Sequence, residues 1–310
     1  MPERLAIVTI DAGSDVRGRV LDQERVGTSS GKGTMADAIR QVGGLAYDSG
    51  CAYRSITLRA MMEGLSPDDE VFRDRLVAWD NAGNFGHSER GLSLFGMDVH
   101  ESVLHGGDVS NRVASFGSSS FVRTYTKHMK VKWLEDFASK WSEPLVAFDG
   151  REMRQFVQER VLGKPRVGAD LLASLVMVVD PIEAAHRRMS SRGEVEYGEK
   201  GWQVHPALVK THEELRKRAL QDEDRPVDGV GMPDEFVLFN EQDGRLSLAE
   251  RHNDSDLEDA LAEGVPIVLD TTGVNTDNVT RTGLNIIARG LMWSESEAHK
   301  AMARKINEIF

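Results

Sequence analysis

The residues best suited to chemistry lie in one short run, Ser29-Ser30-Gly31-Lys32-Gly33-Thr34. Glycines let backbone N–H groups close on phosphate oxygens, because a Cβ would block that approach. In such a loop a lysine reaches the terminal phosphates, a hydroxyl holds Mg²⁺, and the following helix presents its positive N-terminus. Here Lys32 is the candidate lysine and Thr34 the candidate Mg²⁺ ligand. An apolar stripe within 35–42 predicts the helix. The run therefore indicates the second half of a phosphate-binding loop.

The loop departs from the usual pattern on its N-terminal side. In the pattern G-x-x-x-x-G-K-[ST], here with the ending GKGT, the first glycine would fall at Val26, and the nearest glycine is Gly27. The apolar run 5–10 indicates the strand that should lead into the loop, yet the fourteen residues 12–25 lie in between. A Gly/Ser-rich surface turn therefore remains an open interpretation of this stretch on its own.

Buried strands alternating with helices must position this loop. Apolar strand-like runs lie at 5–10, 45–48, 144–148, 171–180 and 265–270. Their alternation with helical stretches predicts an α/β fold with a parallel sheet covered on both faces. Ligands of such sheets bind beyond the carboxyl ends of the strands. Four aspartates stand at such ends: Asp11, Asp48, Asp149 and Asp270.

Several further segments carry structural expectations. A long helix is predicted over 122–140, with its apolar residues on one side and its lysines at 127, 130 and 132 on a solvated face. Residues 226–264 are rich in Asp, Glu and Gly, and we expect a flexible acidic insertion there. Residues 294–310 are expected to form an extra C-terminal helix docked on the core.

Composition bounds the class of protein. The chain has 310 residues, 40% hydrophobic and 28% charged, as expected of a globular protein with a substantial core. A net charge of −12 argues against nucleic acid or an anionic membrane as the main partner. Cys51 is the single cysteine, so no internal disulfide forms. No signal peptide or membrane-spanning stretch is evident, and we expect a cytoplasmic monomer.

With these residues laid out, the chain resembles the cytidylate kinase family of P-loop nucleoside monophosphate kinases over roughly 4–225 and 265–289. The matching segments, in family order, are Gly31-Lys32-Gly33-Thr34, Asp48-Ser49-Gly50-Cys51-Ala52-Tyr53-Arg54, Gly96-Met97-Asp98-Val99, Val109-Ser110-Asn111 followed by Arg123, Gly150-Arg151-Glu152, Arg218 with Asp222 and Arg225, and Asp270-Thr271-Thr272-Gly273. Each segment alone is weak, whereas their joint occurrence in order is specific.

The resemblance implies a P-loop NTPase-type three-layer α/β/α fold. Its core would span 1–54 and 141–289, with an NMP-binding region at 55–140 and a lid at about 188–210. The acidic insertion at 226–264 and the helix at 294–310 would be additions to it. The implied reaction is ATP- and Mg²⁺-dependent phosphorylation of CMP or dCMP, a step of pyrimidine nucleotide metabolism.

The resemblance also implies roles for single residues. ATP would lie on Ser29, Ser30, Gly31, Lys32, Gly33 and Thr34. The acceptor phosphate would be held by Arg54, Arg151 and Arg225, its sugar by Ser49, Arg218 and Asp222, and the cytosine edge by Arg123 and Glu152. Lys32, Arg151 and the lid residue Arg188 would be catalytic, with Thr34 on Mg²⁺ and Asp149 holding it through water. Arginine suits phosphoryl transfer through its permanent charge and bidentate geometry.

Departures from the family keep alternatives open. Val26 and Ser29 replace loop glycines, Glu152 replaces an aspartate, and Ala114 stands where the family has a serine. The altered loop favours a nucleotide-binding protein with impaired catalysis, and the changes at 114 and 152 favour a kinase for UMP or AMP. The chosen arginines could also form structural ion pairs, and Asp149 could cap a helix.

Overall fold

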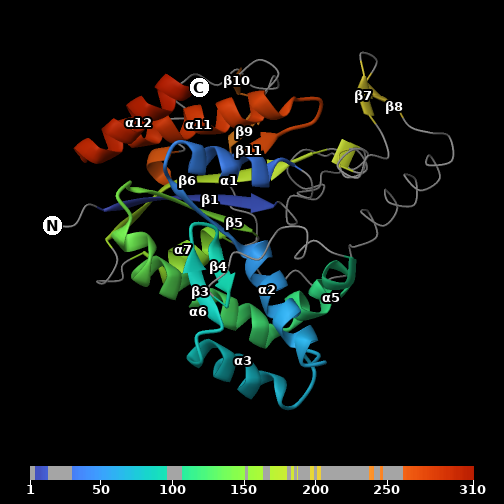
Figure 1. Cartoon of the computed structure of the whole chain (residues 1–310). Helices are drawn as coiled ribbons and strands as arrows, with labels where there is room; N and C mark the ends of the chain where they lie inside the picture. Colours follow the sequence, from blue (N-terminus) through green and yellow to red (C-terminus); the bar gives the residue numbers. More distant parts are fainter. Residues whose placement is uncertain are drawn as a thin grey trace.

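A seven-stranded sheet forms the centre of the protein (Figure 1). This computed structural model describes residues 4–12, 30–95, 107–150, 153–162, 168–179 and 261–310, with short stretches at 183–184, 187, 196–198, 201–203, 237–240 and 245–246. Five parallel strands occur in the order β11 (Ile267–Asp270), β6 (Ala169–Val178), β1 (Leu5–Ala12), β5 (Leu145–Gly150) and β2 (Leu45–Asp48).

Two short strands extend this sheet beyond β11. β9 (Val237–Asn240) pairs with β11 in parallel, and β10 (Arg245–Leu246) pairs with β9 in the antiparallel sense. Both lie inside 226–264, the segment expected to be a flexible acidic insertion. These residues are therefore strands that pair along the edge of β11, whereas the acidic insertion as a whole stays a prediction.

The two faces of the sheet follow from the alternation of side chains along its strands. On β1, Val8 and Ile10 belong to one buried cluster, whereas Ile7 belongs to the other. On β5, Ala147 lies in the first cluster and Phe148 in the second. We call these the α1 face and the α7 face, after a helix that covers each.

Three helices cover the α1 face: α1 (Lys32–Gln41), α11 (Thr276–Trp293) and α12 (Glu297–Ile309) (Figure 1). The expected C-terminal helix is therefore present, and it docks on the core through Met302 and Ile306, which are buried in this cluster. Ser296 caps α12 by accepting a hydrogen bond from the His299 N–H at 3.3 Å.

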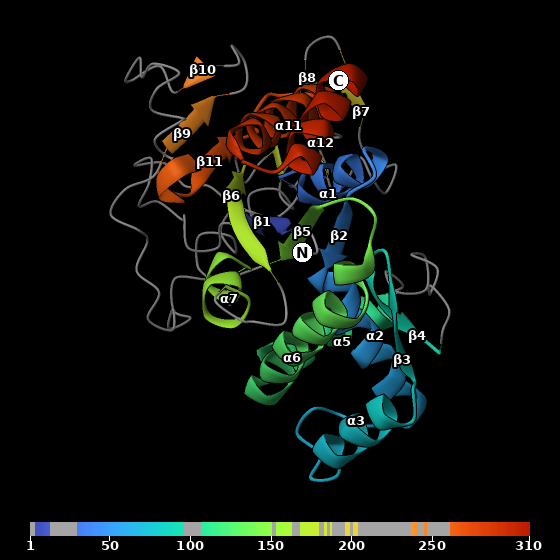
Figure 2. The ribbon, with the colours of Figure 1, turned by 90° about the vertical axis from the view of Figure 1, so that its left-hand side faces the viewer.

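The α7 face is covered by a larger group of helices, seen side-on in Figure 2. α6 (Ser120–Asp136) and α7 (Met153–Arg160) pack on the strands, and an aromatic cluster of Tyr47, Trp133 and Phe148 joins α6 to β2 and β5. The remaining elements on this side are α2 (Ser49–Met62), α3 (Phe72–Asn81), α5 (Gly107–Ser118) and the 3-10 turn η1 (Ala138–Lys140). They are joined by a hairpin of β3 (Phe85–Ser88) and β4 (Gly91–Leu94). A separate hairpin is formed by β7 (Glu196–Gly198) and β8 (Gly201–Gln203).

The predicted fold class is confirmed: a central parallel sheet is flanked by helices on both faces, consistent with a P-loop NTPase-like α/β fold. The division into core, NMP-binding region and lid stays a prediction. Most of the lid range, 188–210, lies outside the described residues. None of the helices in the described part of the chain is long and apolar enough to span a membrane.

Candidate functional site

A glycine turn and the start of α1 form the first part of the site. Gly31 precedes the helix with a φ of 94°, a left-handed conformation that favours glycine. Among the described residues no side chain caps α1, and its first turn contains no acidic residue. A helix start of this kind suits an anion, as expected of a phosphate-binding loop. Lys32, the candidate catalytic lysine, is its first residue.

Asp149 is the partner of Lys32. The lysine Nζ lies 3.2 Å from Oδ1 of Asp149, and the two side chains are 22% and 10% exposed. Burial raises the pKa of Asp149, and the charge of Lys32 opposes that rise. Asp48, its neighbour in the β2–β5 register, adds a like charge that raises this pKa further. Asp149 is thus held by a lysine rather than serving as a helix cap.

The residues of this corner fit a bound Mg²⁺. Oδ1 of Asp149 is buried and accepts no hydrogen bond of good geometry from the described residues, although Lys32 lies within ion-pair distance. Thr34 lies half-buried in the first turn of α1 and brings a hydroxyl. A carboxylate and a hydroxyl are hard oxygen donors, and Mg²⁺ commonly keeps several waters, so a water-mediated contact to Asp149 is chemically suitable.

The start of α2 forms a second polar corner. Asp48 caps the helix by accepting a hydrogen bond from the Cys51 N–H at 3.0 Å, and Ser49 is buried at its first position. Arg54 folds back over this turn: a Cβ on Gly50 would lie 2.8 Å from its Nη1. The Nε of Arg54 is buried and has no hydrogen-bond partner among the described residues. This guanidinium is the candidate group of this corner for an acceptor phosphate.

Asp11 is the functional candidate whose contacts sequence reasoning missed. Alternation along β1 turns it to the α7 face, away from Asp149. Its two carboxylate oxygens accept hydrogen bonds from the N–H groups of Met153, at 2.7 Å, and Arg154, at 3.1 Å. Burial raises the pKa of Asp11 to about 6, and these hydrogen bonds and Lys130 limit the rise. Its place at a strand end was the one available signal.

Lys130 corrects another expectation. It was assigned to a solvated face of α6, yet only 2% of it is exposed. Its Nζ lies 3.6 Å from the Met153 sulfur and 5.3 Å from the centre of the Phe156 ring. The assignment is wrong because α7 packs over this side of α6, which the spacing of apolar residues along α6 alone does not show.

Arg123, the candidate for the cytosine edge, lies half-buried near the start of α6. The Thr126 hydroxyl is 2.9 Å from its carbonyl oxygen and 3.1 Å from the Tyr53 hydroxyl, which ties this turn of α6 to α2 beside Arg54. The other predicted site residues lie outside the described residues: Ser29, Arg151, Glu152, Arg188, Arg218, Asp222 and Arg225.

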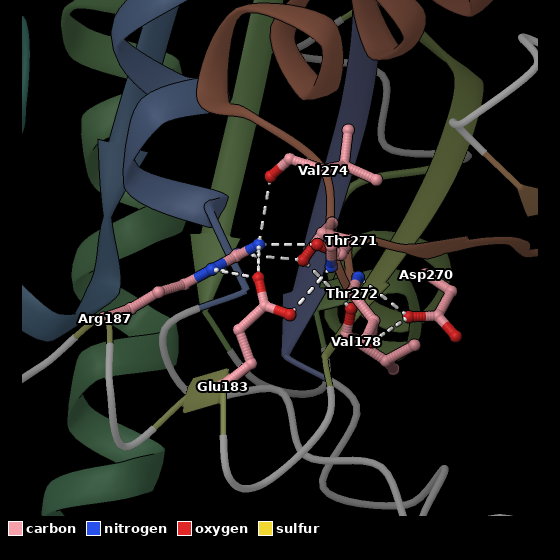
Figure 3. A network of polar contacts seen from close by, with 8 residues as sticks. Val178, Glu183, Arg187, Asp270, Thr271, Thr272 and Val274 are labelled. Atoms are coloured by element: carbon pink, nitrogen blue, oxygen red, sulfur yellow. Dashed lines mark hydrogen bonds and ion pairs between the residues drawn. The ribbon is translucent and has the colours of Figure 1, made fainter. Parts of the chain in front are cut away.

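A polar network fixes the loop between β11 and α11 (Figure 3). Arg187 donates to the carbonyl oxygens of Thr271 and Val274 and to the Thr271 hydroxyl, and it pairs with Glu183 at 2.7 Å. Glu183 in turn accepts the N–H of Gly273 at 2.7 Å. The strand β6 and helix α11 that border this loop also flank the turn at Gly31, since a Cβ on Gly31 would contact Met177 and Val279.

Comparison with known proteins agrees with this geometry. No protein-family profile matches the chain. The chain is 27% identical over 200 residues to a cytidylate kinase of Chlorobaculum tepidum, an alignment covering 64% of this chain and 75% of that protein. It is also 27% identical over 129 residues to a cytidylate kinase of Nitrosomonas eutropha, where the alignment covers 41% of this chain and about half, 52%, of the relative. The chain is therefore similar to cytidylate kinases, at low identity.

Proposed function

We propose that this protein is a nucleoside monophosphate kinase that transfers the γ-phosphoryl group of ATP to CMP or dCMP. The observation that carries the proposal is the pairing of two anion-binding corners at the carboxyl ends of neighbouring strands. One holds Lys32 and Asp149 at the uncapped start of α1, and the other holds Arg54 at the start of α2. Two phosphate-bearing ligands that must meet in line need such an arrangement.

The reaction places modest demands on these residues. An acceptor phosphate oxygen, already anionic, attacks the γ-phosphorus of ATP, the bond to the β-phosphate oxygen breaks, and ADP leaves. No general base is required, so catalysis consists of positioning and charge neutralisation. Mg²⁺, held by Thr34 and through water by Asp149, would neutralise the phosphate oxygens.

We assign Lys32 to the donor phosphates. It exchanges Asp149 for the phosphoryl oxygens when ATP binds, which leaves the Asp149 carboxylate free to hold a metal-bound water. Backbone N–H groups at the start of α1 add a fixed positive dipole. The family resemblance adds Ser29–Gly33 to the ATP site and Arg188 as a lid arginine.

We assign Arg54 to the acceptor phosphate, since its buried Nε has no partner and its Nη1 lies over the start of α2. Ser49 lies in the same turn and is assigned to the sugar. Arg123 lies on α6, which contacts α2 through Thr126 and Tyr53, and is assigned to the base. By the family resemblance, the acceptor site is completed by Arg151, Glu152, Arg218, Asp222 and Arg225.

The test is ADP formation from ATP and Mg²⁺ with CMP, dCMP, UMP and AMP offered separately. We expect turnover with CMP and dCMP alone. Lys32→Met should lower kcat by at least about 10²-fold, as loss of one transition-state donor does. The matched control Lys300→Met removes a lysine of α12 that pairs with Glu297 at 2.9 Å, and it should leave turnover unchanged.

Other outcomes redirect the assignment. Turnover with UMP or AMP but not CMP would reject the cytidine acceptor and retain the kinase. Tight ATP binding without turnover on any acceptor would replace the kinase by a nucleotide-binding protein. Full activity in Lys32→Met would remove Lys32 from the donor site.

A further inference from the structure

Asp11 is a buried carboxylate that the proposed transfer does not use. Its side chain is directed to the α7 face, whereas Asp149 and Lys32 occupy the α1 face. Asp11 accepts the backbone N–H groups of Met153 and Arg154, the first two residues of α7. A helix start has N–H groups without helical partners, and a carboxylate satisfies them with charge-assisted bonds. The end of β1 therefore caps α7, from 142 residues away in the chain.

Lys130 reaches the same point from the opposite side. Its ammonium is buried between the Met153 sulfur and the Phe156 ring, two groups of α7. A buried ammonium is unfavourable unless its surroundings compensate the charge. Asp11 contributes to that compensation, since Lys130 and Asp11 interact electrostatically. The first turn of α7 is thus held between a carboxylate of β1 and an ammonium of α6.

Met153 connects this arrangement to the acceptor corner. Its sulfur lies 3.4 Å from the Ser49 hydroxyl, at the start of α2. Gly150, at the end of β5, packs so closely that a Cβ there would lie 2.7 Å from the same hydroxyl. The chain is therefore fixed against Ser49 at Gly150 and again at Met153.

We propose that Asp11 and Lys130 are positioning residues for the acceptor nucleotide. By holding the first turn of α7, they keep Met153 against the Ser49 hydroxyl, which we assign to the acceptor sugar. Neither side chain needs to touch a substrate. The inference rests on the proposed function for its catalytic consequence, whereas the cap on α7 stands independently of it.

The test combines kinetics with amide hydrogen exchange in Asp11→Asn, Lys130→Met and the double variant, at pH 7.5. Asparagine keeps the size of Asp11 but offers one acceptor oxygen for two N–H groups. We expect the KM for CMP to rise about tenfold in each single variant, with the KM for ATP within about twofold, a loss typical of one charge-assisted hydrogen bond. Because the two residues act on one turn, the double variant should resemble the worse single variant.

Amide exchange at Met153 and Arg154 should accelerate in Asp11→Asn. Ser296→Ala, which removes the cap of the distant helix α12, is the matched control. It should lower stability without changing the KM for either substrate.

An equal rise of both KM values, or a drop in thermal stability alone, would reject the positioning role. Accelerated exchange in a protein whose wild type has no kinase activity would refute the proposed function and leave the cap intact. Unchanged exchange would refute the cap itself.

Discussion

Two aspartates at the end of adjoining strands have different tasks because a strand turns alternate side chains to opposite faces. Asp11 on β1 and Asp149 on β5 are both largely buried, at 9% and 7% exposed. Asp149 lies on the α1 face with Lys32, whereas Asp11 lies on the α7 face with two backbone N–H groups. Both have a raised pKa through burial, so each depends on its own partners to remain charged.

Asp11 should make the free energy of unfolding depend on pH. Burial raises its folded-state pKa from 3.8 to about 6, so the folded state binds a proton between these values that the unfolded state has released. The stability from this proton uptake is fully present below about pH 4 and is lost as the pH rises through about 6. Asp11→Asn cannot titrate and should lack the effect.

Urea unfolding of the wild type and of Asp11→Asn from pH 4 to pH 7.5 measures this pH dependence. The difference in unfolding free energy, wild type minus Asp11→Asn, should fall by up to about 3 kcal/mol between pH 4 and 6.5 and stay level above. A difference that is constant with pH would show that Asp11 titrates at its ordinary pKa in the folded protein.

Sequence reasoning located local structure around single residues. A short motif and an apolar stripe predicted a helix beginning near Lys32, which is the first residue of α1, while the roles of Lys32 and Arg54 in a site stay predictions. Sequence reasoning failed for Asp11 and Lys130 because their partners come from elements far apart in the chain. To know that Asp11 faces α7, one must know which side chains of β1 point to which face of the sheet and where α7 packs. Neither can be derived from the residues around Asp11.

At the scale of elements, the start of α2 depends on a glycine. A Cβ on Gly50 would lie 2.8 Å from Arg54 Nη1 and 3.1 Å from the Asp48 carboxylate. The nearest of these atoms is the end of a flexible side chain, so Gly50→Ala should fold while displacing Arg54. We expect the KM for CMP to rise about tenfold, with the free energy of unfolding changed by less than about 1 kcal/mol.

Gly117→Ala on α5 is the matched control for this change. A Cβ there meets nothing within 4 Å, so alanine should stabilise the helix by up to about 1 kcal/mol and leave both KM values unchanged. If Gly50→Ala retained the wild-type KM for CMP, Arg54 would not be the acceptor-phosphate ligand in its present position.

The loop after β11 depends on one arginine from a distant segment. Arg187 donates to two carbonyl oxygens and a hydroxyl of this loop and neutralises Glu183, which is only 13% exposed (Figure 3). Arg187→Ala removes these bonds and leaves Glu183 without this counter-charge. We expect it to destabilise the fold by about 2–4 kcal/mol, measured by urea unfolding.

Two further variants serve as controls for Arg187→Ala. Arg187→Lys keeps the charge but lacks the forked geometry, so it should recover only part of the loss. Arg304→Ala removes an exposed arginine 3.9 Å from Glu297 and should change stability by less than about 0.5 kcal/mol. An Arg187→Ala variant as stable as Arg304→Ala would mean that the network does not hold the loop.

Elements were predictable where periodicity is strong and local. The runs that became β1, β5 and β6 are apolar enough to be identified alone, and the 122–140 pattern gave α6 within a few residues of its bounds. The apolar run Val237-Leu238-Phe239 of β9 is short and stands among acidic and glycine-rich neighbours, so it was missed, and pairing with β11 stabilises it as a strand.

For the whole molecule, the sheet separates the functions of its two ends. The proposed anion-binding corners lie at the carboxyl ends of β1, β2 and β5. At the opposite end of β1, the C-terminal helix α12 contacts Arg4, the residue before this strand. There His299 of α12 is buried, with Nε2 2.7 Å from the Arg4 carbonyl oxygen and Nδ1 2.7 Å from the Ser294 hydroxyl. The carbonyl is an acceptor only, so Nε2 donates and Nδ1 accepts. α12 is thereby tied to the beginning of β1.

This separation predicts that a substitution at the α12 end of the sheet lowers the stability of the protein without changing its catalysis. Arg4 and Asp11 lie about seven residues apart along one strand, roughly 23 Å. His299→Ala leaves the Arg4 carbonyl and the Ser294 hydroxyl without this partner and opens a cavity in the core, so we expect a loss of about 2–4 kcal/mol in urea unfolding. The KM values and the kcat per folded molecule should stay within about twofold of wild type, because nothing at the carboxyl ends of the strands moves. A selective rise in the KM for CMP would instead show that α12 communicates with the acceptor corner through β1, and the two ends of the sheet would have to be treated as one coupled unit.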